Sequence, residues 1–108
     1  MAKKWNDSKR ELLKEGHITE EGVMFADIKL HLAEVFYGLR EKNKLSQQEL
    51  AKAVGVSQPY IARIENGEEN LTIETIAKLL LALKTCFKVI PENRHSKKEN
   101  VLQFLKAA

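Results

Sequence analysis

The side chains best placed to do chemistry carry hydrogen-bond donors and acceptors on one short segment. Gln58, Tyr60 and Arg63 bring an amide, a phenol and a guanidinium together there. All three groups can recognise a ligand by directed hydrogen bonds. The segment is too short to be stable alone in water, so neighbouring elements must hold it.

Catalytic groups do not cluster in the same way. His17, His31 and His95 fall in a loop, a helix and a polar tail. A short basic chain could cut RNA by general acid–base chemistry, but such a ribonuclease needs its groups close together. No cluster of carboxylates or basic residues replaces the histidines, and the chain is predicted not to be an enzyme.

The single cysteine, Cys86, indicates a reducing compartment, by default the cytoplasm, because it has no second cysteine to pair with. No nearby histidine completes a zinc set, and we expect no metal or cofactor. Lys84 and Lys88 are its only basic neighbours, so a small buried apolar residue is a better interpretation than a nucleophile.

Size and charge favour one compact domain with an appended segment. The chain has 108 residues, 44% hydrophobic and 31% charged, with 18 Lys and Arg against 15 Asp and Glu. The net charge of +3 and the pI near 9.0 suit a polyanion without demanding one. The charged N-terminus and the lack of a long apolar run predict neither a signal peptide nor a membrane span.

Apolar spacing predicts a mainly α-helical fold. A short amphipathic helix over 4–15 ends at Gly16, and helical character resumes near Thr19. Apolar residues then recur three or four positions apart and predict the buried stripe of a first core helix: Ile28, Leu32, Val35, Phe36 and Leu39.

Two short helices follow, separated by a tight turn. Ser46-Gln47-Gln48-Glu49 has the form of a capping box, and the helix it starts ends at Gly55. Ser57 caps the next helix, which has Pro59 in its first turn and runs to about Glu65. Small Ala51 is expected where these two helices cross.

The last core helix and one strand complete the expected elements. Thr72 can cap a helix that closes the core with apolar side chains: Ile73, Ile76, Leu79, Leu80 and Leu83. Thr85 to Ile90 alternates as a strand that ends at Pro91. The tail from Glu92 is polar, with a short helix around 101–105.

The pattern from Leu50 to Gly67 resembles the helix-turn-helix family of phage repressors and Cro proteins. The residues that carry the resemblance are Leu50-Ala51, Gly55-Val56-Ser57, Tyr60-Ile61 and Ile64-Glu65-Asn66-Gly67, within a match from Ile28 to Leu83. An αα-hairpin without a DNA role would not need the polar side chains named at the outset.

The resemblance implies that the helix after Ser57 enters the major groove by its N-terminal end. Glutamine can pair with adenine, arginine can fork onto guanine, and Pro59 or Tyr60 can contact a thymine methyl. The implied base readers are Gln47, Gln48, Ser57, Gln58, Pro59, Tyr60 and Arg63. Backbone N–H groups of both short helices would bind phosphates, helped by Lys44, Lys52, Asn66 and Asn70.

The same resemblance pairs Arg40 with Glu65 as a structural ion pair and implies a homodimer on a palindromic operator in double-stranded DNA. The strand gives an independent reason for a dimer, because an apolar strand without a partner in its own chain can pair with a second copy. We expect Thr85, Phe87 and Val89 in that dimer strand, with Phe87 and Val89 facing the dimer core.

The order of segments resembles HigA-type antitoxins of bacterial toxin–antitoxin operons. It comprises a helical extension (1–26), the helix-turn-helix domain (27–84), a dimerisation strand (85–91) and a polar tail (92–108). The resemblance implies autoregulation of the operon and a RelE-like ribonuclease toxin as partner, bound by Trp5, Leu12 and Leu13. Such toxins are usually basic, so the high pI departs from the pattern. A stand-alone phage-type or housekeeping regulator is the alternative.

Overall fold

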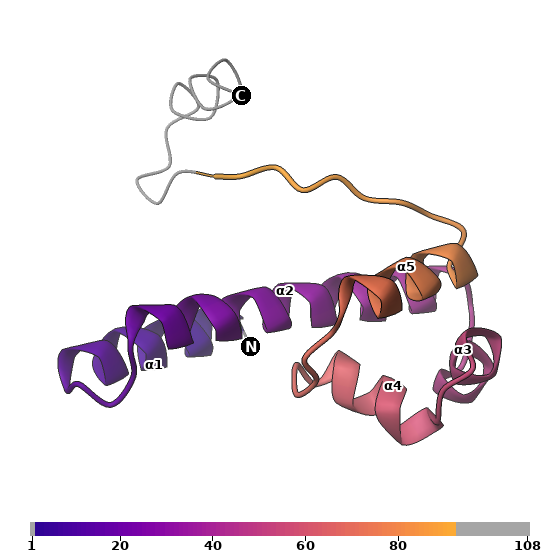
Figure 1. The fold of residues 1–108 in the computed structure, drawn as a ribbon. Coiled ribbons are helices and arrows are strands. Elements are labelled where there is room, and N and C mark those ends of the chain that lie inside the picture. Colours follow the sequence, from indigo (N-terminus) through magenta and orange to yellow (C-terminus); the bar gives the residue numbers. More distant parts are fainter. Residues whose placement is uncertain (1, 93–108) are drawn as a thin grey trace, which may run out of the picture.

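The computed structural model describes residues 2–92, with side chains described from Asp7 onward, and the secondary structure of this part is helical. The predicted all-α class is therefore confirmed there. The tail helix expected near 101–105 lies outside the described residues. The helices are α1 (Ala2–Lys14), α2 (Glu20–Lys42), α3 (Gln47–Val54), α4 (Gln58–Glu65) and α5 (Ile73–Ala82) (Figure 1).

Hydroxyl side chains start the four helices α2 to α5. The sequence predicts the last three of these caps. Each cap residue is extended, and its side-chain oxygen accepts the backbone N–H three residues later. Gly55 ends α3 with φ of 85°, a left-handed conformation that a β-carbon would strain. The caps are Thr19, Ser46, Ser57 and Thr72.

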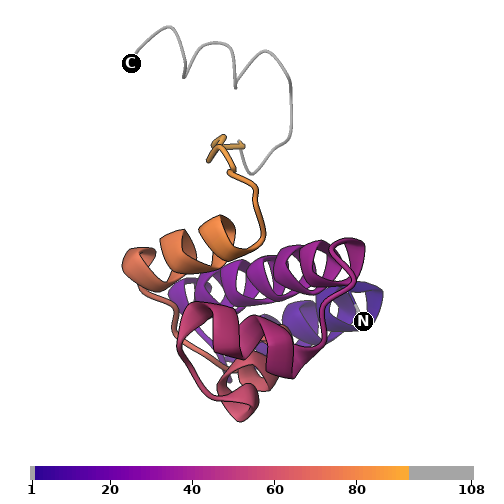
Figure 2. The same cartoon turned by 90° about the vertical axis from the view of Figure 1, so that its right-hand side faces the viewer.

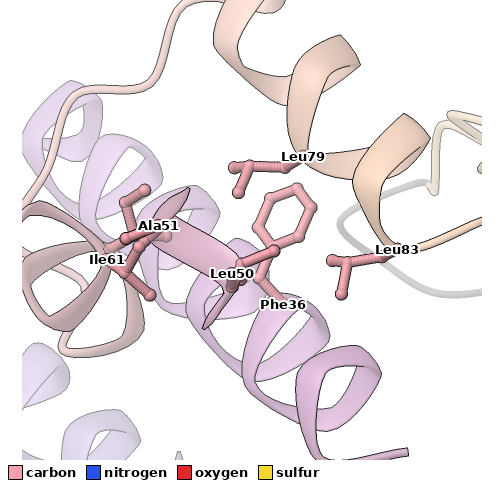
Figure 3. Close-up of a cluster of buried hydrophobic side chains, with 7 residues drawn as sticks. Phe36, Leu50, Ala51, Ile61, Leu79 and Leu83 are labelled. Atoms are coloured by element: carbon pink, nitrogen blue, oxygen red, sulfur yellow. The ribbon is translucent and has the colours of Figure 1, made fainter. Parts of the chain in front are cut away.

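One hydrophobic core joins α2, α3, α4 and α5. Phe36 lies at its centre, with Leu79 and Leu83 of α5 on one side and Leu50 of α3 beside it (Figure 3). Ala51 is 3% exposed, and its small side chain lets α3 and α4 approach closely. Burial of these residues braces two helices of only eight residues each.

Three apolar residues expected in the core are exposed instead. Ile28 is 52% exposed, Val35 44% and Ile73 85%. Successive helix residues are about 100° apart, so Val35 turns outward when its neighbour Phe36 points into the core. Ile73 is the first residue of α5, and Ile28 belongs to the part of α2 that α1 accompanies. Helical spacing predicted the stripe correctly but not how much of it neighbouring helices cover.

The N-terminal helices form an arm beside the domain. Helix α1 runs along the first half of α2, away from α3 and α4 (Figures 1 and 2). Lys9 Nζ lies 2.9 Å from Asp27 Oδ2, which ties the two helices together. Leu12 is half-buried and Leu13 is 38% exposed. Trp5 lies within α1, but its side chain is outside the described part.

Residues 85–92 leave the bundle after α5 as an extended segment, and no strand occurs within them (Figures 1 and 2). The predicted strand therefore does not form within a single chain. A strand needs a neighbour to supply its hydrogen bonds, so pairing across a dimer stays a prediction.

A buried ion pair ties the end of α4 to α2. Arg40 is 9% exposed, and its Nε and Nη2 donate to the two carboxylate oxygens of Glu65 at 2.6 and 2.9 Å. Its Nη1 donates to the carbonyl oxygen of Leu45 at 2.8 Å. The hydrogen bonding of Arg40 to Glu65 raises the pKa of Arg40, so the guanidinium stays charged. The structural role predicted for this pair agrees with the geometry.

Glu65→Ala should lower the free energy of unfolding by about 3 kcal/mol, because the buried Arg40 guanidinium loses its two-pronged partner and keeps only the exposed Glu41 carboxylate, 3.6 Å away. The matched control is Glu74→Ala, which removes an exposed carboxylate 3.5 Å from Lys78 and should change stability by less than about 0.5 kcal/mol. Urea denaturation followed by circular dichroism measures both. Equal losses in the two variants would contradict a structural role for Glu65.

Candidate nucleic-acid interface

Helix α4 presents polar side chains outward from its N-terminal end to Arg63 in its last turn. Ser57, Pro59 and Arg63 are exposed, and Gln58 and Tyr60 are half-buried. Ile61 and Ile64, on the opposite face, are buried and hold the helix against the core. The arrangement that the sequence predicts for this helix, apolar inward and polar outward, is therefore present.

A chain of hydrogen bonds orients the two glutamines. Glu65 Oε1 accepts from Gln47 Nε2 at 3.1 Å, and Gln47 Oε1 accepts from Gln58 Nε2 at 2.6 Å. Since an ionised carboxylate can only accept, Gln47 must turn its nitrogen to Glu65 and its oxygen to Gln58. Gln58 keeps one N–H and its amide oxygen without a partner among the described residues. A free donor beside a free acceptor is the pattern that pairs with adenine.

The carboxylate of Glu69, which the sequence did not predict to be part of the site, holds the Arg63 side chain. Its Nε donates to Glu69 Oε2 at 2.9 Å, and its guanidinium carbon lies 5.6 Å from the centre of the Tyr60 ring. The terminal nitrogens of Arg63 keep their N–H groups free of acceptors within the described part of the chain. Glu69 belongs to a polar loop, and only its charge and nearness in sequence could have pointed to this contact.

The N-terminus of α3 is held by the predicted capping box. Glu49 N donates to Ser46 Oγ at 3.0 Å, and Ser46 N donates to Glu49 Oε1 at 2.8 Å. The backbone hydrogen bond from Ser46 lowers the pKa of Glu49, so its carboxylate stays ionised near neutral pH. The cap fixes the start of the helix that carries Gln47 and Gln48.

The residues expected at phosphates do not form one group. Gln48 and Lys52 are one turn apart on the exposed side of α3, and Lys44 lies in the loop before it. Asn66 is the C-terminal cap of α4, about 13.5 Å along the helix from Ser57 at 1.5 Å per residue. Asn70 follows in the loop toward α5. The structure thus places Asn66 and Asn70 near the far end of α4.

Other kinds of site find no support in the described residues. They contain no group of three or more His, Cys, Asp or Glu side chains that could hold a metal ion. None of the helices between residues 2 and 92 is long and apolar enough to cross a membrane.

A helix-turn-helix family model matches residues 38–86, which include α3, the turn and α4. An HTH-type transcriptional regulator of Haemophilus influenzae is 34% identical over 87 residues, covering 81% of this chain and 84% of that protein. The control protein C.SmaI of Serratia marcescens is 41% identical over 63 residues, covering 58% of this chain and 75% of the relative.

Two solved structures have the same fold over the domain. A chain of a HipA-HipB-O2-O3 complex is 31% identical and aligns with a TM-score of 0.52, covering 60% of this chain and 92% of that chain. A chain of a toxin–antitoxin module from Streptococcus pneumoniae is 29% identical and aligns with a TM-score of 0.55, covering 82% of this chain and 92% of that chain.

The match to the Haemophilus regulator includes most of both chains, and the family model falls on the two helices whose geometry is described above. Members of this family regulate transcription by binding DNA and do not catalyse a reaction. The chain belongs to the helix-turn-helix family and is an XRE-type DNA-binding transcriptional regulator, not an enzyme.

Proposed function

We propose that this regulator is a sequence-specific repressor that binds a palindromic operator as a homodimer and serves as the antitoxin of a toxin–antitoxin pair. The observation that carries the DNA-reading part is the outward polar end of α4, where Gln47 orients the amide of Gln58. An amide held in advance loses little conformational entropy when it meets a base.

Base recognition in this proposal belongs to Gln58, Pro59, Tyr60 and Arg63, with Ser57, Gln47 and Gln48 beside them. Lys44, just before α3, and Lys52, in the last turn of α3, bind phosphates. Helix N–H groups without intrahelical partners at the start of α3 add to the attraction. Asn66 and Asn70 contact the backbone farther along the groove. Base contacts select the sequence, and phosphate contacts position the protein.

Arg63→Ala should weaken binding to a selected operator by about 1–3 kcal/mol and leave binding to scrambled DNA nearly unchanged, because a base-directed contact is lost. Lys52→Ala is the control. It should weaken binding to both duplexes alike and reduce the slope of log affinity against log salt concentration by about one. Fluorescence anisotropy at several salt concentrations measures both. An equal loss on both duplexes for Arg63→Ala would assign Arg63 to the phosphate backbone instead.

The homodimer is supported by apolar surface at the C-terminal side of the domain. On α5, Ile73 and Leu81 are two turns apart and 85% and 79% exposed. Phe87 and Val89 of the extended segment are also exposed. A second copy could cover this surface and pair with residues 85–90 as an antiparallel strand, with Thr85, Phe87 and Val89 in the ribbon.

Val89→Pro should convert the dimer to monomers, because proline removes an N–H from the ribbon and fixes φ near −65°. Val89→Ile keeps both the N–H and the apolar side chain and serves as the control. Sedimentation equilibrium gives the mass of each variant. An unchanged dimer for Val89→Pro would refute the strand assignment.

The antitoxin role is supported by the arm of α1 and α2. Similarity to the Streptococcus toxin–antitoxin module covers 82% of the chain, which is more than the helix-turn-helix match alone. The proteins named above include a chain of a HipA-HipB complex and none named HigA, so the RelE-like ribonuclease partner rests on the resemblance in segment order. We assign the toxin-facing surface to α1, with Leu12 and Leu13 and with Trp5.

Leu13→Asp should abolish capture of a RelE-like protein encoded beside this gene, because it places a charge in an apolar contact. Leu13 is 38% exposed, so the fold and the operator affinity should persist. Lys14→Asp, next to it on α1, is the control for added negative charge. Pull-down of the co-expressed neighbour measures the effect, and full capture by Leu13→Asp would exclude this surface.

A stand-alone regulator is the second candidate, favoured by the Haemophilus regulator and the control protein C.SmaI among the relatives. In that case the arm packs only on its own chain. The neighbouring gene separates the two: a small RelE-like reading frame supports the antitoxin, and its absence favours the stand-alone regulator.

A further inference from the structure

Glu69 places a negative charge beside the proposed DNA-reading surface, where phosphates will repel it. Its side chain is 24% exposed and accepts from Arg63 Nε at 2.9 Å. The loop that carries it is anchored, because Glu68 N donates to the carbonyl oxygen of Arg63 at 2.9 Å. A β-carbon on Gly67, which has φ of +73°, would lie 3.0 Å from Leu30 of α2. Glu69 is therefore held close to α4.

The contact divides the guanidinium into two parts. The Nε–H is taken by Glu69, and the Tyr60 ring lies 5.6 Å from the guanidinium carbon. The two terminal nitrogens have no acceptor within the described chain. Guanine offers two acceptors, N7 and O6, side by side in the major groove, and the free end of the fork can meet both.

The negative charge of Glu69 beside Arg63 affects two kinds of DNA contact differently. Attraction to phosphates depends on net charge, and the nearby carboxylate offsets that charge. Base recognition depends on directed donors, which the terminal nitrogens retain. The carboxylate thus penalises non-specific binding more than operator binding.

We propose that Glu69 is a specificity-determining residue that acts through Arg63: it positions the guanidinium for a base edge and suppresses its attraction to phosphates. This inference rests on the proposed base-reading role of Arg63. Glu69 touches the reading residue and need not touch a base itself.

The test compares E69Q with the matched control E68Q. Glu68 is exposed, and its side chain forms no hydrogen bond or ion pair within the described chain, so E68Q removes the same charge one residue away. The probes are a duplex that the wild-type protein selects from random-sequence DNA and a scrambled duplex of the same composition. Affinities are measured at several salt concentrations, and thermal melting checks the fold.

We expect E69Q to bind the scrambled duplex about three- to tenfold more tightly and with a salt slope steeper by about one, because an unmasked arginine gains a phosphate contact. Affinity for the selected duplex should rise less, so the ratio of the two affinities falls. E68Q should leave that ratio unchanged. When E69Q is added to Arg63→Ala, the ratio should be the same as in Arg63→Ala alone.

An equal effect of E68Q and E69Q would overturn the inference in favour of general charge. So would an E69Q ratio equal to that of the wild type. If Arg63→Ala alone keeps the full ratio, the base-reading role of Arg63 fails, and this inference fails with it. If Arg63→Ala lowers the ratio of the two affinities but E69Q leaves it unchanged, only the proposed role of Glu69 is rejected, and the base-reading role of Arg63 stands.

Discussion

The hydrogen-bonded path from Arg40 through Glu65 and Gln47 to Gln58 is the interaction on which the proposed reading surface depends. Its buried end is an ion pair that ties α2 to the end of α4, and its outer end is a glutamine at the start of α4. Because the carboxylate accepts only, its orientation propagates through two amides to the surface. One buried charge pair therefore serves both stability and the presentation of a donor–acceptor pair to DNA.

The chain combines a rigid domain with two apolar surfaces that the domain leaves exposed. Helices α3 and α4 are each eight residues long and owe their order to caps and to a common core. The arm of α1 and the first half of α2, and the surface formed by α5 with residues 87–90, lie outside that core. Such surfaces on a small regulator fit association with other chains. They give the proposed toxin contact and the proposed dimer separate places on the molecule.

Local chemistry was predictable where one or two residues determine it. The hydroxyl caps of α3, α4 and α5, the left-handed Gly55 and the capping box of Ser46 and Glu49 were correctly expected, because each depends on neighbours within a few positions. Burial was less predictable: Ile28, Val35 and Ile73 fit the helical stripe but remain exposed. Exposure depends on which helices cover a face, and spacing along one helix carries no information on this.

The sequence by itself determined the limits of α3 and α4, the tight turn between them and the outward polar face of α4, since these follow from backbone preferences and apolar periodicity. Only the tertiary structure decided which polar side chains meet. Gln47 and Gln58 bond across the turn, and Arg63 bonds to Glu69 of the next loop. These contacts join separate elements, and the crossing of α3 and α4 and the path of the loop set their distances. Hydrogen bonds need donor and acceptor about 3 Å apart. The packing of these elements therefore decides which side chains are close enough to bond.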